Sequence, residues 1–398
     1  MGAEHFIPLR KAELTERLVG EPALSDLERA AVSKVFDRLA KALHAEFYRR
    51  LDSLKNLYAP FDPDLGTTPL QPKANEAKRE QLRKLFDEFD ELAERANFRV
   101  LTLKDLNEAM AHCSHWGLNL QVDIDAFEQL EIYARGNVIG KRQQRRLRNW
   151  MRVEDVDVPI YERLIVMFRL APTTKIRKKL DADSVFIKLF KDIPQLDLDM
   201  LLPATSVKMT LVDQMKILLP TMSGLAIALW KIVQMVLFAA FAGIYAVVGL
   251  VGGTIGYGIR SFYGYLNTKN KYQLSLTESL YYQNLDNNAG VFFRLLDEAE
   301  EQENCEAMLG YFFLWRHASN SGMSADELDT RVESFLQGLA GRTVDFEVSD
   351  ALAKLERFGL LEKTDDRYRV PAPEAASAQL DGAPSGASPF APARVLLH

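Results

Sequence analysis

Apolar residues recur every three or four positions through most of the first hundred residues, which is the spacing of amphipathic helices. The pattern is clearest in Leu24–Leu57, where Ser25 stands at the position of a helix N-cap. Two prolines in Tyr58–Asp64 predict a rigid turn after this helix. The same spacing predicts three further helices, over Leu9–Val19, Ala74–Ala96 and Leu103–Trp116.

The pattern changes after residue 126, where β-branched and aromatic residues begin to alternate with polar ones. Three segments of this kind predict strands, and they are Phe127–Tyr133, Pro159–Leu170 and Ser184–Lys191. We expect them to form a small, mostly antiparallel sheet that packs on the preceding helices, in an α+β domain.

A basic segment, Arg135–Arg152, separates the first two predicted strands and reads as a loop. It holds seven basic residues, no acidic residue and one Trp. A solvated loop, a contact with anionic lipid headgroups and a contact with nucleic acid all fit this composition. The residues that we expect to contact lipid headgroups or a partner are Lys141, Arg142, Arg145, Arg146, Arg148, Trp150 and Arg152.

The longest apolar stretch runs for 43 residues from Ile217 to Ile259 and carries one charge, Lys231. A transmembrane helix needs about 20 apolar residues, so the stretch predicts a membrane anchor. Its length fits a hairpin of two helices, and the alternative is one crossing over Ile232–Ile259 after an interfacial helix. Basic residues flank both ends, and the positive-inside bias therefore favours the hairpin, with both termini in the cytoplasm.

Four glycines in the second half of this stretch have the small-x-x-x-small spacing that lets membrane helices pack closely. They are Gly249, Gly252, Gly253 and Gly256. The same spacing allows a homo-oligomer that forms through the glycine-rich helix. A dinucleotide-binding loop is disfavoured, because it needs a preceding strand.

Helical spacing returns after the apolar stretch, over Leu276–Leu285, Gly290–Ala318, Ser324–Leu339 and Ser349–Phe358. Leu360–Val370 then predicts a β-hairpin, and this order of elements predicts a winged-helix-like domain. From Glu278 to Val370 there are 19 acidic and 9 basic residues, a net charge of −10, which disfavours DNA as the ligand. Residues 371–398 are rich in Ala, Pro, Ser and Gly and predict a disordered tail.

Composition adds few candidates for chemistry. The two cysteines, Cys113 and Cys305, are far apart and fit a reducing compartment. His112 and His115 form the only tight cluster of metal-ligating residue types, but further ligands are missing, so we expect no metal. A calcium loop at Asp62–Asp64 lacks the rest of its pattern, which favours a turn. No familiar catalytic motif occurs, so the sequence assigns no catalytic residue and no cofactor, and it leaves open whether the protein is an enzyme.

Several segments resemble one known family. The most specific are Phe186–Pro194, Asp197–Pro203 and Leu280–Asn288, with further similarity in His5–Arg10 and Leu57–Asp64. On these segments the chain looks like a bacterial member of the transmembrane protein 143 family, a membrane domain of unknown function. The resemblance covers roughly residues 4–370. It implies an integral membrane protein, and it implies no activity, cofactor or catalytic residue.

Together these patterns predict an N-terminal α+β domain (1–205), a membrane anchor (206–270), an acidic winged-helix-like domain (271–370) and a tail (371–398). The opening residues match no signal or transit sequence, so the apolar stretch is the expected membrane signal. We expect a multi-pass protein of the inner (cytoplasmic) membrane that acts as a non-enzymatic scaffold, with membrane lipids, anionic ones included, and an unknown protein as partners. The alternatives are a membrane-tethered DNA-binding regulator, although nucleic acid is disfavoured by charge, and a lipid-associated enzyme.

Overall fold

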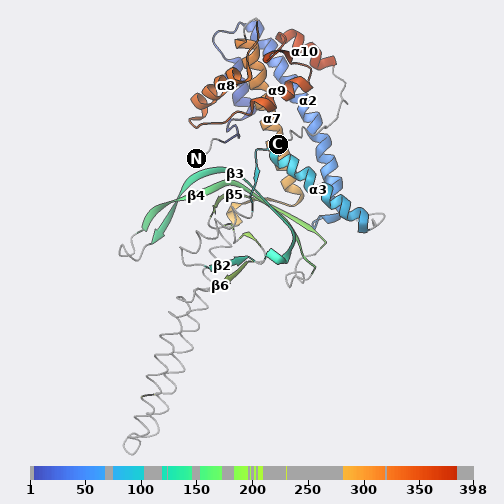
Figure 1. Ribbon diagram of the computed structural model, residues 1–398, viewed down its shortest axis with the longest axis vertical. Coiled ribbons are helices and arrows are strands. Elements are labelled where there is room, and N and C mark those ends of the chain that lie inside the picture. The colour runs from blue at the N-terminus through green and yellow to red at the C-terminus, as the bar shows by residue number, and fades with distance from the viewer. Residues whose placement is uncertain are drawn as a thin grey trace, which may run out of the picture.

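The computed structural model of the 398-residue chain describes residues 4–67, 75–102, 119–122, 124–145, 153–172, 183–195, 198, 201–202, 205–208, 230, 281–318 and 321–382. In this part of the chain, most helices gather at one end and a curved antiparallel sheet lies below them (Figure 1).

The α-helices are α1 (Lys11–Val19), α2 (Asp26–Tyr58), α3 (Asn75–Arg95), α7 (Ala289–His317), α8 (Ala325–Ala340), α9 (Val348–Arg357) and α10 (Pro373–Gly382). The strands are β1 (Arg99–Val100), β2 (Asn119–Val122), β3 (Phe127–Arg145), β4 (Val153–Leu170), β5 (Val185–Pro194), β6 (Thr205–Lys208), β7 (Asn284–Asn287), β8 (Glu362–Thr364) and β9 (Arg367–Arg369). Two 3-10 helices, η1 (Ala59–Phe61) and η2 (Ile124–Ala126), complete the described elements.

Two long helices, α2 and α7, form the centre of the helical part (Figure 1). The backbone N–H of Glu28 donates to the Ser25 hydroxyl, and the backbone N–H of Ser25 donates to the Glu28 carboxylate, so the predicted N-cap of α2 is confirmed. One hydrophobic core joins α1 and the first half of α2 to α7, α8, α9 and α10. This core therefore crosses the predicted boundary between the N-terminal and C-terminal domains.

The prediction of a disordered tail is wrong for its first part, because Pro373–Gly382 forms α10. Ala376 is fully buried in the core, and the guanidinium of Arg38 on α2 pairs with Asp381. An alanine-rich segment has little apolar surface of its own, and it becomes helical here because α2 supplies a surface to bury it. Residues 383–398 lie outside the described part.

The sheet has five antiparallel strands in the order β1-β3-β4-β5-β7. Tyr133, Ile165 and Ile187 point to one face and pack in a core with α2, α3 and α7. Leu164 and Val166 point to the other face and pack in a separate core. An antiparallel sheet that packs on helices confirms the α+β part of the prediction.

The hairpin of β3 and β4 is longer than the sequence pattern indicated. The two strands pair as far out as Arg145 and Val153. The basic segment continues β3 through Arg145, so its prediction as a loop is wrong there, because the hydrogen bonds to β4 set the backbone whatever charge the side chains carry. Asn284 and Leu285, predicted as the end of the helix Leu276–Leu285, likewise belong to a strand, because β7 (Asn284–Asn287) pairs with β5.

Gly136 interrupts the two-residue period of this hairpin. Its φ is +76°, a conformation that favours glycine. Tyr161, across the hairpin, shares a core with Leu164, although strict alternation would place two residues three apart on opposite faces. A β-carbon at Gly136 would lie 2.5 Å from a carboxylate oxygen of Glu162. Glycine is therefore required by both backbone angle and space.

The C-terminal helices and hairpin follow the predicted order, α7, α8, α9, β8 and β9. On α9, in the place of a recognition helix, buried Lys354 pairs with Glu303 and Glu306 of α7. Burial opposes the charge of Lys354, but its carboxylate neighbours outweigh burial and raise its pKa. Arg357 pairs with Glu46 of α2. Both basic side chains of α9 therefore form ion pairs within the chain.

The predicted membrane anchor is not supported. None of the described helices is long and apolar enough to cross a membrane, and even the 33-residue α2 carries charged residues along its length. The stretch 217–259, except Trp230, lies outside the described residues, as do Gly249, Gly252, Gly253 and Gly256. The fold class is corrected to a mixed α+β fold with an antiparallel sheet and without the transmembrane hairpin. The predictions of an integral membrane protein and of an inner-membrane location are withdrawn with it.

Gly136→Ala should lower the free energy of unfolding by roughly 1–3 kcal/mol, since the new β-carbon meets Glu162 at a positive φ. Urea denaturation measures the change. Gly338→Ala is the control, because Gly338 lies in α8 with open space at its β-carbon position and should gain roughly 0.5–1 kcal/mol. Equal stabilities for the two variants would contradict a requirement for glycine at 136.

Candidate functional site

The first described residues form a strap (residues 4–10) that crosses from the sheet to α7. The backbone N–H of Ile7 donates to the Gln302 side-chain oxygen at 2.8 Å, and the Gln302 amide nitrogen donates to the Ile7 carbonyl at 3.0 Å. Gln302 is buried, so both of its bonds are shielded from water. Glu301 accepts a hydrogen bond from the Lys11 backbone N–H at 2.9 Å, where α1 begins. Two polar residues of α7 therefore fix the strap and the helix that follows it.

Arg135 of β3 lies buried under the strap. Its guanidinium carbon stands 4.1 Å from the ring centre of Phe6 and 4.6 Å from that of Phe98, which places the cation between two aromatic rings. It donates to the carbonyl of Ala96 at 2.9 Å and to the carboxylate of Glu298 at 2.7 Å. Burial lowers the pKa of Arg135, and Glu298 opposes that shift. Through these contacts Arg135 connects the strap, the sheet, the end of α3 and α7.

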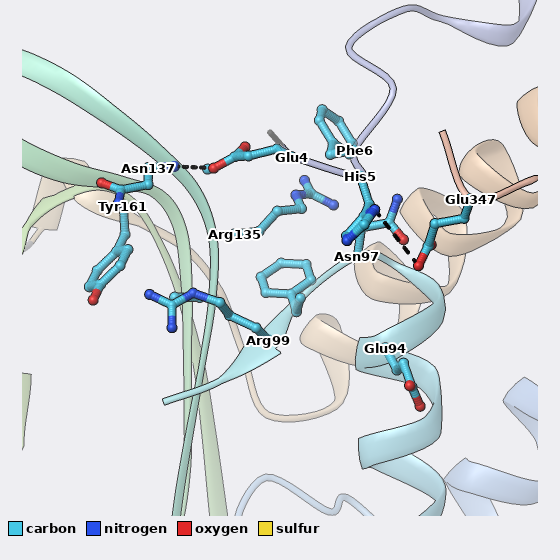
Figure 2. Close-up of a pocket in the computed structure, with 13 residues that line it drawn as sticks. Glu4, His5, Phe6, Glu94, Asn97, Arg99, Arg135, Asn137, Tyr161 and Glu347 are labelled. Carbon is cyan, nitrogen blue, oxygen red and sulfur yellow. Dashed lines mark hydrogen bonds and ion pairs between the residues drawn. The ribbon is translucent and has the colours of Figure 1, made fainter. Parts of the chain in front are cut away.

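A cavity of about 510 Å³, here called the carboxylate pocket, opens on one side of Arg135 (Figure 2). Glu4, Glu94 and Glu347 line it together with Arg99, which lies 6.0 Å from the ring of Tyr161.

Most polar groups of the carboxylate pocket already have partners. Glu4 accepts from the backbone N–H of Asn137 at 2.5 Å, and His5 lies 3.9 Å from the carboxylate of Glu347 (Figure 2). Burial raises the pKa of Glu347, and the charge of His5 opposes the shift. The side-chain nitrogen of Asn97 is buried without a hydrogen-bond partner among the described residues. These contacts tie the strap to the sheet and to the start of α9.

A second cavity, of about 370 Å³, is called the arginine pocket. It shares Phe6 and Arg135 with the carboxylate pocket, so the two cavities are neighbours and residues of the strap line both. Its cations are Arg10, Arg135, Arg163 and Arg342. Its carboxylates are Glu162, Asp192, Glu298 and Glu301.

A row of three cations runs across the sheet, and two of its members, Arg135 and Arg163, line this pocket. Register places Arg135 of β3 directly opposite Arg163 of β4, and Arg163 directly opposite Lys191 of β5. Only Arg135 has an ion pair with a described carboxylate, that of Glu298. Like charges directly opposite each other destabilise a sheet, so this row needs a source of negative charge.

Most carboxylates of the arginine pocket are occupied by other partners. Glu162 lies 3.5 Å from the guanidinium of Arg342, and Glu301 binds the start of α1. Arg163 donates to the backbone carbonyl of Glu162 at 2.9 Å, and its Nε is buried without a partner among the described residues. Arg10 is exposed and has no ion pair within the described ranges. The guanidinium of Arg10 and the Nε of Arg163 therefore remain to bind an anion.

The helix-facing side of β3 carries a second polar cluster two residues before Arg135, in which Tyr133 is buried, Glu131 is half-buried and Asp90 is exposed. The Tyr133 hydroxyl lies 2.7 Å from a carboxylate oxygen of Asp90 and 2.5 Å from one of Glu131. One hydroxyl proton cannot serve both carboxylates, so one carboxyl group must itself carry a proton. Burial raises the pKa of Glu131 to about 7, with a further contribution from Asp90, which favours Glu131 as the carboxyl group that keeps its proton on the acidic side of neutral pH.

The structure tests few of the residues singled out from the sequence. β3 includes Lys141, Arg142 and Arg145, but the structure describes only the backbone of these three residues and not their side chains. The others of that set, which are Arg146, Arg148, Trp150 and Arg152, lie outside it altogether. Their contact with lipid headgroups or a partner stays a prediction.

Of the two metal sites considered from the sequence, one lies outside the described residues and the other lies within them. His112 and His115 lie outside the described residues, which hold no group of three metal-ligating side chains. Asp62 accepts from the backbone N–H of Asp64 at 2.9 Å, the geometry of the predicted turn.

Sequence reasoning placed Arg135 at the edge of a basic loop and missed its burial. It also missed Arg10, Arg163 and Arg342, because they come from distant segments that only the fold brings together. The sequence did contain one indication of this site: Arg135 and Arg163 interrupt the apolar alternation of their strands.

A family described as protein of unknown function (DUF3754) matches residues 161–290, which are 130 of the 398 residues. The match includes Glu162, Arg163 and Lys191 but neither the strap nor Arg135. No solved structure matches the chain. The resemblance to the transmembrane protein 143 family stays a prediction.

Arg135→Met should lower the free energy of unfolding by roughly 3 kcal/mol, because it removes the buried cation of this ion pair, leaves the Ala96 carbonyl without its donor, and leaves Glu298 with only the more exposed Arg294 as a partner. Urea denaturation measures this loss. Arg294→Met is the matched control: Arg294 also pairs with Glu298 but is 39% exposed, so its loss should cost less than about 1 kcal/mol. Equal losses would show that Arg135 is no more important than a surface cation.

Glu131→Gln should remove part of the pH dependence of stability. Between pH 4.5 and 7 the unfolded chain has released the Glu131 proton while the folded chain keeps it, so wild-type stability falls as the pH rises through this window. The amide cannot ionise and still accepts from Tyr133, so the variant should gain stability relative to wild type at pH 8 compared with pH 4. Urea denaturation across this range tests the expectation, with exposed Glu128→Gln as control. Parallel pH profiles for wild type and Glu131→Gln would contradict it.

Proposed function

We propose that the protein binds a small ligand through an oxyanion group in the arginine pocket, and that the group is a phosphate. The observation that carries this proposal is the row of Arg135, Arg163 and Lys191, in which only the first has an ion pair with a described carboxylate. A bound anion would relieve the repulsion within the row.

The chemistry of the pocket favours phosphate over other anions. Guanidinium groups present a planar fork of N–H donors that matches the oxygens of a phosphate in pairs. Arg163 has a buried Nε that lacks a partner among the described residues, and exposed Arg10 stands at the same pocket. The volume of about 370 Å³ lies in the range of about 300–1,000 Å³ that is usual for small-ligand sites.

A purely structural role is the alternative, since the pocket is lined by four arginines and four carboxylates. Such a network would be complete within the chain and would gain nothing from an added anion. The two roles therefore differ in their response to phosphate, which makes the proposal testable without knowledge of the natural ligand.

Isothermal titration calorimetry with inorganic phosphate should detect one site per chain at low ionic strength. Arg163→Gln should weaken this binding at least about tenfold, because a charge-assisted hydrogen bond contributes roughly 1.5–3 kcal/mol. Phosphate should also raise the unfolding temperature of wild type more than that of the variant. Acetate and sulfate at equal ionic strength separate a preference for phosphate from a general preference for anions.

Arg79→Gln is the matched control, because it removes one exposed arginine from α3, outside the arginine pocket. It should leave phosphate binding unchanged. Equal binding by wild type and Arg163→Gln would show that phosphate binds elsewhere, and no binding to wild type would favour the structural role.

A further inference from the structure

One carboxylate of the arginine pocket, that of Asp192, has no partner in the part of the chain that the structure describes. The residue is exposed, and neither an ion pair nor a side-chain hydrogen bond joins it to another described residue. Two of the other carboxylates form ion pairs with arginines of the pocket, and the third accepts a hydrogen bond from the start of α1. These three belong to Glu162, Glu298 and Glu301. Asp192 therefore brings an unpaired negative charge to the pocket.

The backbone of β5 breaks its regular alternation at Asp192, whose φ is +53°. Phe190 and Ile193 pack in one core, although strict alternation would place residues three apart on opposite faces. Register puts this break in the same row across the sheet as the break at Gly136. Glycine would meet the backbone requirement at 192 equally well, and aspartate is one of the few other residues that adopt such a φ routinely. What aspartate adds here is a carboxylate.

Positive groups without partners line the same cavity of about 370 Å³. Arg10 is exposed and has no ion pair within the described ranges. The buried Nε of Arg163 has no hydrogen-bond partner among the described residues. The arginine pocket thus offers donors for an anion and, separately, an acceptor for a cation.

The formal charges of the pocket residues cancel, since four arginines stand against four carboxylates. A ligand with several phosphates would suit a pocket with an excess of positive charge, and here a second phosphate would be repelled by Asp192. A ligand with one phosphate and one cationic group matches the unpaired groups of both signs. An ammonium group makes a charge-assisted hydrogen bond to a carboxylate, whereas a hydroxyl would leave the charge of Asp192 unbalanced.

We infer that the ligand of the arginine pocket is a small phosphate monoester that also carries a primary ammonium group, and that Asp192 selects it. The phosphate lies against Arg163 and Arg10, and the ammonium group donates to the carboxylate of Asp192. Phosphoethanolamine is the simplest compound of this class. The inference rests on the proposed phosphate site and names the class of ligand that the site takes.

Isothermal titration calorimetry of the full chain with phosphoethanolamine and with propyl phosphate tests the inference. The two esters have the same shape, and propyl phosphate has a methyl group in place of the ammonium group. Phosphoethanolamine should bind about three- to tenfold more tightly at low ionic strength, a modest gain because an exposed carboxylate keeps contact with water. Inorganic phosphate, measured alongside, reports on the phosphate site alone.

Two variants test the residue. Asp192→Asn and Asp192→Gly both remove the carboxylate, and asparagine and glycine both adopt a positive φ readily, so the backbone should be kept. Each variant should lose the preference for phosphoethanolamine while it still binds propyl phosphate. Asp37→Asn is the matched control, because it removes an exposed carboxylate from α2, outside the pocket, and should keep the preference. Circular dichroism checks that each variant is folded.

The results distinguish a failure of this inference from a failure of the proposed function. Equal binding of the two esters by wild type would leave the phosphate site in place and overturn the ammonium assignment. A preference that persists in both Asp192 variants would mean that another group recognises the ammonium. Absence of binding by both esters and by inorganic phosphate would overturn the phosphate site itself.

A lipid headgroup could supply the same chemistry, since phosphatidylethanolamine carries a phosphate and a primary ammonium group. Co-sedimentation with vesicles of phosphatidylethanolamine and phosphatidylcholine separates the two sources. Binding to these vesicles without binding to free phosphoethanolamine would assign the site to a lipid and overturn the inference of a small ligand. Binding to free phosphoethanolamine without binding to the vesicles would support it.

Discussion

The buried cation of Arg135 is the constraint on which the arrangement of this protein depends. A charge in the interior must be matched, and here the match comes from four segments that are distant in sequence. Glu298 on α7 supplies the carboxylate, Ala96 after α3 supplies a carbonyl, and Phe6 and Phe98 cover the two faces of the guanidinium. The relative positions of strap, sheet and helices are therefore fixed at one point.

Buried polar side chains along α7 are paired with other elements in the same way. Its buried polar residues Gln302, Glu303 and Glu306 would be costly if unpaired, and each has a partner on another element. Gln302 binds the strap, whereas the two glutamates bind cations on α3 and α9. The strap held in this way lines both cavities beside Arg135, the carboxylate pocket and the arginine pocket.

Helix positions were the most predictable part of the fold. The N-cap at Ser25 and the helices of the C-terminal half follow from spacing and capping chemistry, which are local properties of the chain. The length of the β3–β4 hairpin was not predictable in the same way. Its outer half carries the basic residues of an expected loop, and pairing with β4 makes it a strand. The alanine-rich α10 similarly depends on the surface of α2.

The α+β class, the position of most helices and the inner strands follow from the sequence, because hydrophobic period and capping act over a few residues. It also marked 217–259 as the longest apolar stretch, but none of the described helices could span a membrane. The burial of Arg135, and the meeting of Arg10, Arg163 and Arg342 beside it, depend on how the distant segments pack in the fold. The physical reason is that a charged residue has the same local signature in a solvated loop and in a buried ion pair, and the two differ only in what the fold places around it.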